Sequence, residues 1–91
     1  MDEASFAGLL KALEAEAFEN QRLALLRSAS ASQHFVIAQV ARLLAAFSFD
    51  SNKLGVVRML RRRILDKQDA YKLSESFPFS SSKSKMLQML R

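Results

Sequence analysis

Apolar residues recur every three or four positions through most of the chain, the spacing of one face of an amphipathic helix. No stretch alternates between apolar and polar residues as a half-buried strand would, so the pattern predicts an all-α fold of six short helices. These helices are expected at about 4–17, 20–29, 33–47, 51–65 and 67–76, and from Ser81 to the end. The third is the most apolar and is expected to be the most buried. Its inward residues are Val36, Ile37, Val40, Leu43, Leu44 and Phe47.

The chain aligns with itself at a spacing of about 30 residues. Phe18, Phe49 and Phe79 fall in register, and each is followed by polar residues and then by apolar positions at helical spacing. A period of this length is typical of a helix–turn–helix unit, which cannot bury its apolar face alone. We therefore expect a single domain over residues 1–91, complete or part of a larger protein, in a compact or superhelical stack. Its three units are expected at about 4–31, 32–65 and 66–91.

The turn before the predicted fourth helix carries capping residues. Asp50 stands where an N-cap is expected, and its carboxylate can accept from the free N–H groups of the first turn. Phe49 then precedes the cap and Leu54 is the fourth helical residue, the pair that forms a hydrophobic staple. The corresponding residues of the other two units are Phe18, Leu23, Phe79 and Ser80.

This central segment, from Phe47 to Leu54, resembles the hallmark of a small family of domains of unknown function. Its members carry repeated F-x-F-D-S-D-K-L-like units, and the likeness extends over nearly the whole chain. Asn52 stands where many relatives have a second acid. The resemblance implies an all-helical repeat module, often attached to other domains, and it implies no catalytic residues.

Composition excludes several functional classes. The sequence has no cysteine and one histidine, which excludes a disulfide scaffold, a thiol nucleophile and a zinc finger and leaves no set of ligands for a transition metal. Two glycines and one proline exclude a glycine-rich phosphate loop. No cofactor or metal is expected. The acidic N-terminus is not a targeting signal, which, with the lack of cysteine, fits the cytosol.

The whole chain has a net charge of +5, and its basic residues gather in the second half. Arg58, Arg61 and Arg62 share one face of the predicted fourth helix, and Lys67 follows. Arginine binds phosphate and carboxylate groups bidentately, so this face suits an anionic partner. The alternative interpretation is a solvated face whose charges favour the helix dipole.

Two functions remain open at this point. His34 is the only histidine and has no carboxylate or serine partner at catalytic spacing, so we do not expect an enzyme. The first hypothesis is a non-enzymatic protein–protein interaction or scaffolding module. The alternative is an electrostatic binder of nucleic acid or anionic lipid, because the sequence has a basic face. It has no aromatic RNA-binding motif that would indicate recognition of specific RNA sequences.

Overall fold

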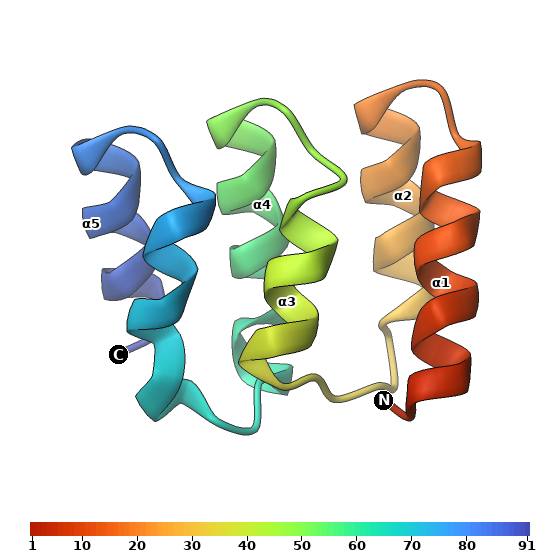
Figure 1. Cartoon of the computed structure of the whole chain (residues 1–91), viewed down its shortest axis with the longest axis horizontal. Coiled ribbons are helices and arrows are strands. Elements are labelled where there is room, and N and C mark those ends of the chain that lie inside the picture. The colour runs from red at the N-terminus through yellow and green to blue at the C-terminus, as the bar shows by residue number, and fades with distance from the viewer.

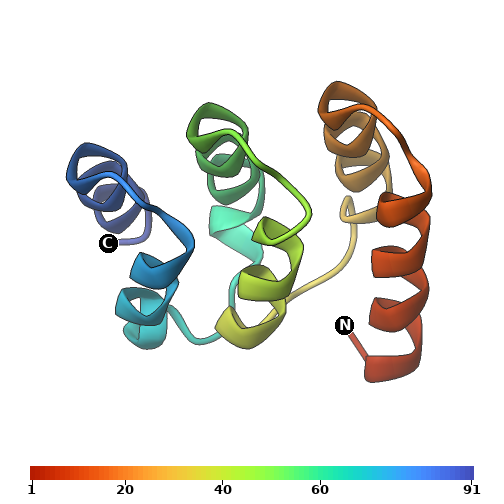
Figure 2. The same ribbon diagram turned by 45° about the horizontal axis from the view of Figure 1, so that its top comes forward.

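The helices of this protein form three antiparallel pairs. The computed structural model describes residues 1–91. The elements are α1 (Glu3–Ala15), α2 (Glu19–Ala29), α3 (Ile37–Leu44), α4 (Asp50–Leu60), η1 (Arg61–Arg63), η2 (Lys67–Ser76) and α5 (Ser80–Met89). η1 is a single 3₁₀ turn that extends α4, so the predicted all-α fold with six helices is confirmed. Figures 1 and 2 show the pairs α1–α2, α3–α4 and η2–α5 side by side in a row.

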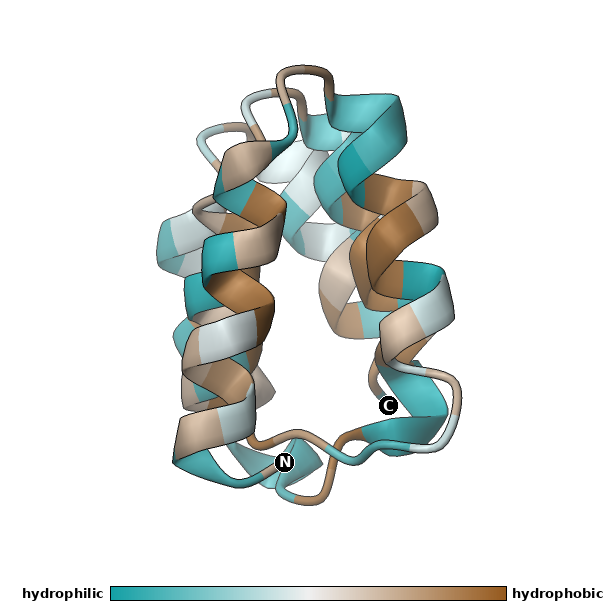
Figure 3. Ribbon diagram, turned by 90° about the vertical axis from the view of Figure 1, so that its right-hand side faces the viewer, coloured by the Kyte–Doolittle hydropathy of each residue, from teal (hydrophilic) through white to brown (hydrophobic).

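The six helices lie in two layers. α1, α3 and η2 form one layer, and α2, α4 and α5 form the other. The shortest dimension of the molecule is 18 Å, which fits two layers of helices packed about 8–10 Å apart. Viewed along the row, the more hydrophobic stretches of the helices face the space between the layers (Figure 3). The core therefore lies between the layers, where 19 hydrophobic residues are buried.

The connections between helices lie at two opposite edges. The turns within the pairs, residues 16–18, 45–49 and 77–79, lie at the edge drawn uppermost in Figure 1, which we call the turn edge. The linkers between pairs, residues 30–36 and 61–66, lie at the opposite edge together with the N-terminus, and we call this the linker edge.

The two linkers pair with each other through their backbones. Phe35 N–H donates to the carbonyl of Arg63 at 2.8 Å, and Leu65 N–H donates to the carbonyl of Phe35 at 2.9 Å. Phe35 and Ile64 thereby form an isolated parallel bridge. Because both segments are extended there, the third helix begins at Ile37 rather than near residue 33, and the fourth does not continue to residue 65.

The bridge also changes the composition of the core. Val36, predicted to face inward, is 37% exposed, whereas Phe35 is fully buried. Alternate residues of an extended segment point to opposite sides, so burying Phe35 turns Val36 outward. The rest of the predicted stripe of the third helix is buried as expected.

The fifth predicted helix has the expected range but a different geometry. η2 is a 3₁₀ helix, and its buried residues Ala70 and Leu73 are three positions apart. A 3₁₀ helix has three residues per turn, so these two side chains lie in one row against the core.

A carboxylate links the first pair to the second. Glu19, the first residue of α2, accepts from the backbone N–H of Ser48 at 2.5 Å and from the side-chain amide of Asn52 at 2.8 Å. Burial raises the pKa of Glu19, but these hydrogen bonds outweigh it and hold the pKa below its usual value of 4.5.

The corresponding residue of the second pair has no such link. Asp50 is the first residue of α4, and its Oδ2 is buried without a hydrogen-bond partner. Ser48 stands two residues before α4 begins, and Pro78 stands two residues before α5 begins. In the second pair, the N–H of Ser48 donates to Glu19. The corresponding residue of the third pair is Pro78, and proline has no N–H to donate.

We expect Glu19→Ala to destabilise the fold more than Asp50→Ala. Hydrogen bonds to a charged group contribute about 1.5–3 kcal/mol each, whereas a carboxylate in the first turn of a helix contributes about 0.3–1 kcal/mol through the dipole. Urea denaturation should therefore give a loss at least about 1 kcal/mol larger for Glu19→Ala. Equal losses would show that the link contributes nothing beyond the dipole.

The same link predicts a pH dependence. Because the folded protein binds the Glu19 proton less tightly than the unfolded chain, the stabilisation is complete above the usual pKa of 4.5 and is lost as pH falls through the lowered pKa. Wild type should exceed Glu19→Gln in free energy of unfolding at about pH 6, and the difference should shrink toward about pH 3. Asp2, whose pKa is lowered by hydrogen bonds from Ser5, is present in both proteins and cancels. A constant difference would contradict the prediction.

Candidate functional site

Three phenylalanines lie exposed at the turn edge. Phe18, Phe49 and Phe79 each expose 65% of their surface, and we call them the phenylalanine row. They immediately precede α2, α4 and α5, whose first residues Figure 1 shows at the same edge. Large aromatic rings are usually mostly buried, so three exposed rings on one edge make this edge unusually apolar.

The structure corrects the predicted caps by one residue. Phe49 has extended backbone angles, and its carbonyl accepts from the N–H four residues later at 3.0 Å, so Phe49 itself is the N-cap of α4. Phe18 and Phe79 are the N-caps of α2 and α5. Asp50 and Ser80 are instead the first residues inside their helices, and no side chain caps any of the three helices.

The predicted hydrophobic staples are wrong for the same reason. A staple joins the residue before the N-cap to the fourth helical residue. Phe49 is itself the N-cap, and Leu54 is the fifth residue of α4. Leu23 and Leu54 are partly buried against the core, while the phenylalanines remain in solvent.

The predicted basic residues gather at the linker edge. Arg58 lies in the last turn of α4, Arg61 and Arg62 lie in η1, and Lys67 begins η2. The three arginines are exposed and Lys67 is half-buried. None of the four forms a salt bridge; the ion pairs of the protein join Arg42 to Glu3 and Lys72 to Asp69. The structure therefore brings these four residues to one edge without neutralising them.

The predicted α-helical face is not formed in its expected geometry. α4 ends at Leu60, and the following 3₁₀ turn contains Arg61, Arg62 and Arg63. The extended segment around Ile64, which pairs with Phe35, prevents the α-helix from continuing. The arginines consequently surround the end of a helix instead of lining one side of it.

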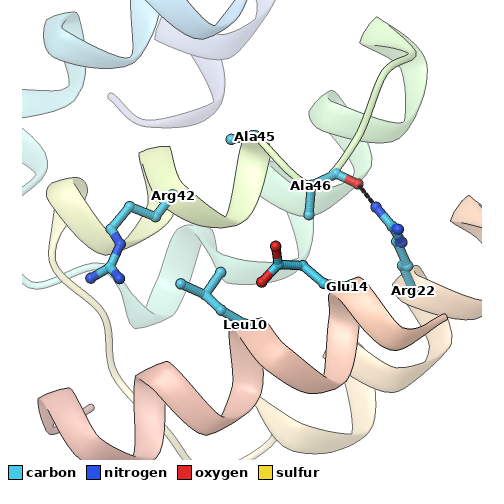
Figure 4. Close-up of a pocket in the computed structure, with 6 residues that line it drawn as sticks. All are labelled: Leu10, Glu14, Arg22, Arg42, Ala45 and Ala46. Atoms are coloured by element: carbon cyan, nitrogen blue, oxygen red, sulfur yellow. Dashed lines mark hydrogen bonds between the residues drawn. The ribbon is translucent and has the colours of Figure 1, made fainter.

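A cleft of about 490 Å³ lies between the first pair and α3 (Figure 4). Both of its arginines are engaged: Arg22 donates to the carbonyl of Ala46 at 2.5 Å, and Arg42 pairs with Glu3 at 2.8 Å. The residues that line the cleft are Leu10, Glu14, Arg22, Arg42, Ala45 and Ala46. The carboxylate of Glu14 is left facing a floor of alanine and leucine, with no hydroxyl or thiol beside it.

Other chemistry-bearing groups are dispersed. His34 is exposed in the first linker, and its carbonyl accepts from the amino group of Met1. No three histidine, aspartate or glutamate side chains gather as a metal site. None of the helices has the length and hydropathy that a membrane span requires.

Sequence reasoning does not find two features of these edges. It places the phenylalanines in buried staples, because an apolar residue at helical spacing is usually buried. It also misses the contact between linkers, since pairing of Phe35 with Ile64 joins residues 29 positions apart. The one local signal is that Leu65 falls outside the apolar stripe of the predicted fourth helix.

Comparison with known proteins identifies the family of this chain. No curated protein and no solved structure matches the chain. Residues 1–90 match the model of a family described as a domain of unknown function, DUF4476. Because this match covers nearly the whole chain, the protein belongs to the DUF4476 family.

Proposed function

We propose that this domain is a non-enzymatic interaction module that docks another protein on the phenylalanine row. The observation that carries the proposal is the 65% exposure shared by Phe18, Phe49 and Phe79. Rings this exposed add little to the stability of the fold, whereas aromatic side chains are frequent anchors of protein interfaces. Removing these rings from water in an interface would favour binding through the hydrophobic effect.

We infer further that the three helix pairs are copies of one unit, over about 4–31, 32–65 and 66–91. The inference is supported by the phenylalanine N-cap that begins the second helix of every pair. Pairs arranged in a row present their N-caps at successive positions, which suits an elongated partner segment that contacts each ring in turn.

The cleft between the first pair and α3 supports a role without catalysis. Catalysis requires a nucleophile, acid or base placed next to its partner groups. Arg22 and Arg42 are already engaged there, and Glu14 has no such neighbour.

Replacing any one residue of the phenylalanine row with serine should weaken docking and leave the fold intact. Peptides selected on the wild-type domain from a random display library should bind Phe18→Ser, Phe49→Ser and Phe79→Ser about tenfold or more weakly, because aromatic anchors contribute strongly to binding. Each substitution should change the free energy of unfolding by less than about 0.5 kcal/mol, since the rings are exposed.

Tyr71→Ser is the matched control, because Tyr71 is 62% exposed but lies within η2, away from the turn edge. Peptides that bind all four variants as they bind wild type would contradict docking on the phenylalanine row.

A second function is favoured by the unpaired arginines of the linker edge. We propose that Arg58, Arg61 and Arg62, with Lys67, bind a phosphate-bearing partner. Guanidinium groups that have no carboxylate neighbour are free to take phosphate oxygens bidentately. The salt bridges of this protein involve none of these residues, which supports the proposal.

Binding through these residues should depend steeply on salt. With long-chain polyphosphate as the probe and about four phosphates neutralised, affinity should fall about hundredfold between about 50 and 200 mM salt. Reversal of Arg58, Arg61 and Arg62 to glutamate should abolish binding, whereas the control Lys11→Glu, Lys83→Glu, Lys85→Glu carries the same charge and should retain most of it, because these lysines lie within α1 and α5. Equal losses in both variants would indicate a response to net charge alone and would contradict a site at the linker edge.

A further inference from the structure

Two aliphatic side chains project together from the linker edge. The parallel bridge joins Phe35 to Ile64, and both of these side chains are buried. In extended segments the next residue points to the opposite side, so Val36 and Leu65 are directed outward. Val36 is 37% exposed and Leu65 is 66% exposed. Because the register of the bridge sets Val36 beside Leu65, they form one apolar patch, which we call the aliphatic pair.

The aliphatic pair is held in place rather than carried on a loose loop. The hydrogen bonds at 2.8 and 2.9 Å fix both linkers at the bridge. The backbone N–H of Ile37, directly after Val36, also donates to Asp66 at 2.8 Å, and Asp66 directly follows Leu65. The patch therefore keeps its shape without a partner.

Bases flank the aliphatic pair along the chain. Arg61 and Arg62 are exposed a few residues before Leu65, Arg63 is half-buried, and Lys67 follows two residues after it. None of these four bases forms a salt bridge.

Each acidic residue at this edge has a hydrogen-bond or ion-pair partner. Asp66 accepts from Ile37 N–H, and Asp69 lies 3.9 Å from Lys72. Asp2 caps α1 through Ser5, and Glu3 pairs with Arg42. Asp2 and Asp66 keep their negative charges, but the four unpaired bases outnumber them, so the net charge around the aliphatic pair is positive.

We infer that the linker edge docks on an anionic membrane surface. The aliphatic pair enters the boundary between headgroups and acyl chains, and Arg61 and Arg62 bind the lipid phosphates around it. This inference rests on the second proposed function and names its partner. Anionic lipid attracts each nearby base enough to raise binding about fivefold, and buried aliphatic area adds to that attraction.

A nucleic acid fits the same edge less well. The exposed bases suit a phosphate backbone, but single-stranded nucleic acid is held by aromatic rings on which its bases stack. At this edge the aliphatic pair offers no ring, Tyr71 near Lys67 is a single exposed ring rather than a series, and the phenylalanine row lies at the opposite edge.

The test is co-sedimentation of the full chain with vesicles of phosphatidylcholine, with or without about 30% phosphatidylserine, at about 50 and 200 mM salt. Wild type should bind only the anionic vesicles. Val36→Ser with Leu65→Ser should weaken that binding about tenfold at unchanged net charge, because the acyl boundary no longer receives the aliphatic pair. Phe18→Ser with Phe49→Ser, which removes exposed apolar residues from the other edge, should bind as wild type does.

Charge reversal separates the inference from the function on which it rests. Arg61→Glu with Arg62→Glu should lose at least about 25-fold in vesicle binding, and Lys83→Glu with Lys85→Glu should lose less. If the arginine variant loses binding while Val36→Ser with Leu65→Ser does not, membrane insertion is wrong and the phosphate-binding function stands. If neither variant loses vesicle or polyphosphate binding, both proposals are wrong.

Two further results would overturn the inference. Wild type could fail to bind anionic vesicles at either salt concentration. Wild type could also bind a mixed-sequence single-stranded RNA more tightly than the vesicles, with no effect of Val36→Ser and Leu65→Ser, which would assign the edge to nucleic acid. Circular dichroism spectra of all variants should match that of wild type, because none of the substituted side chains belongs to the buried core.

Discussion

The backbone pairing of Phe35 with Ile64 is the constraint on which much of this structure depends. It closes the linker edge by joining two connections that are separate in the sequence. It ends the α-helical geometry of the fourth helix, delays the start of α3 and buries one aromatic and one aliphatic side chain. The same alternation that buries these two residues sends Val36 and Leu65 into solvent among the arginines.

The turn edge follows from a different local rule. The first residue of α2 and of α4 carries a carboxylate, which favours the positive end of the helix dipole. The phenylalanine before it is the N-cap and its ring remains outside the core, and Phe79 takes the same place before the uncharged Ser80. Glu19 uses its carboxylate to join two pairs, whereas Asp50 Oδ2 is buried without a hydrogen-bond partner and Pro78, at the position corresponding to Ser48, has no N–H.

The two edges therefore offer different surfaces on a thin, two-layered body. One presents aromatic rings and the other presents arginines around an aliphatic pair. The helices separate the two edges, so the two proposed docking surfaces do not overlap. The two proposals are therefore compatible with each other on one domain.

The sequence by itself determined the helical class, the number of helices and most of the core, because hydrophobic periodicity is a local property that burial enforces. It also determined the positive charge of Arg58, Arg61, Arg62 and Lys67, which does not depend on the fold. Only the tertiary structure decided that Phe18, Phe49 and Phe79 are exposed and that the fourth helix stops at Leu60. A one-residue shift of an N-cap and a hydrogen bond between distant linkers leave no periodic trace in the sequence, because both are selected by contacts that exist only after the helix pairs have packed together.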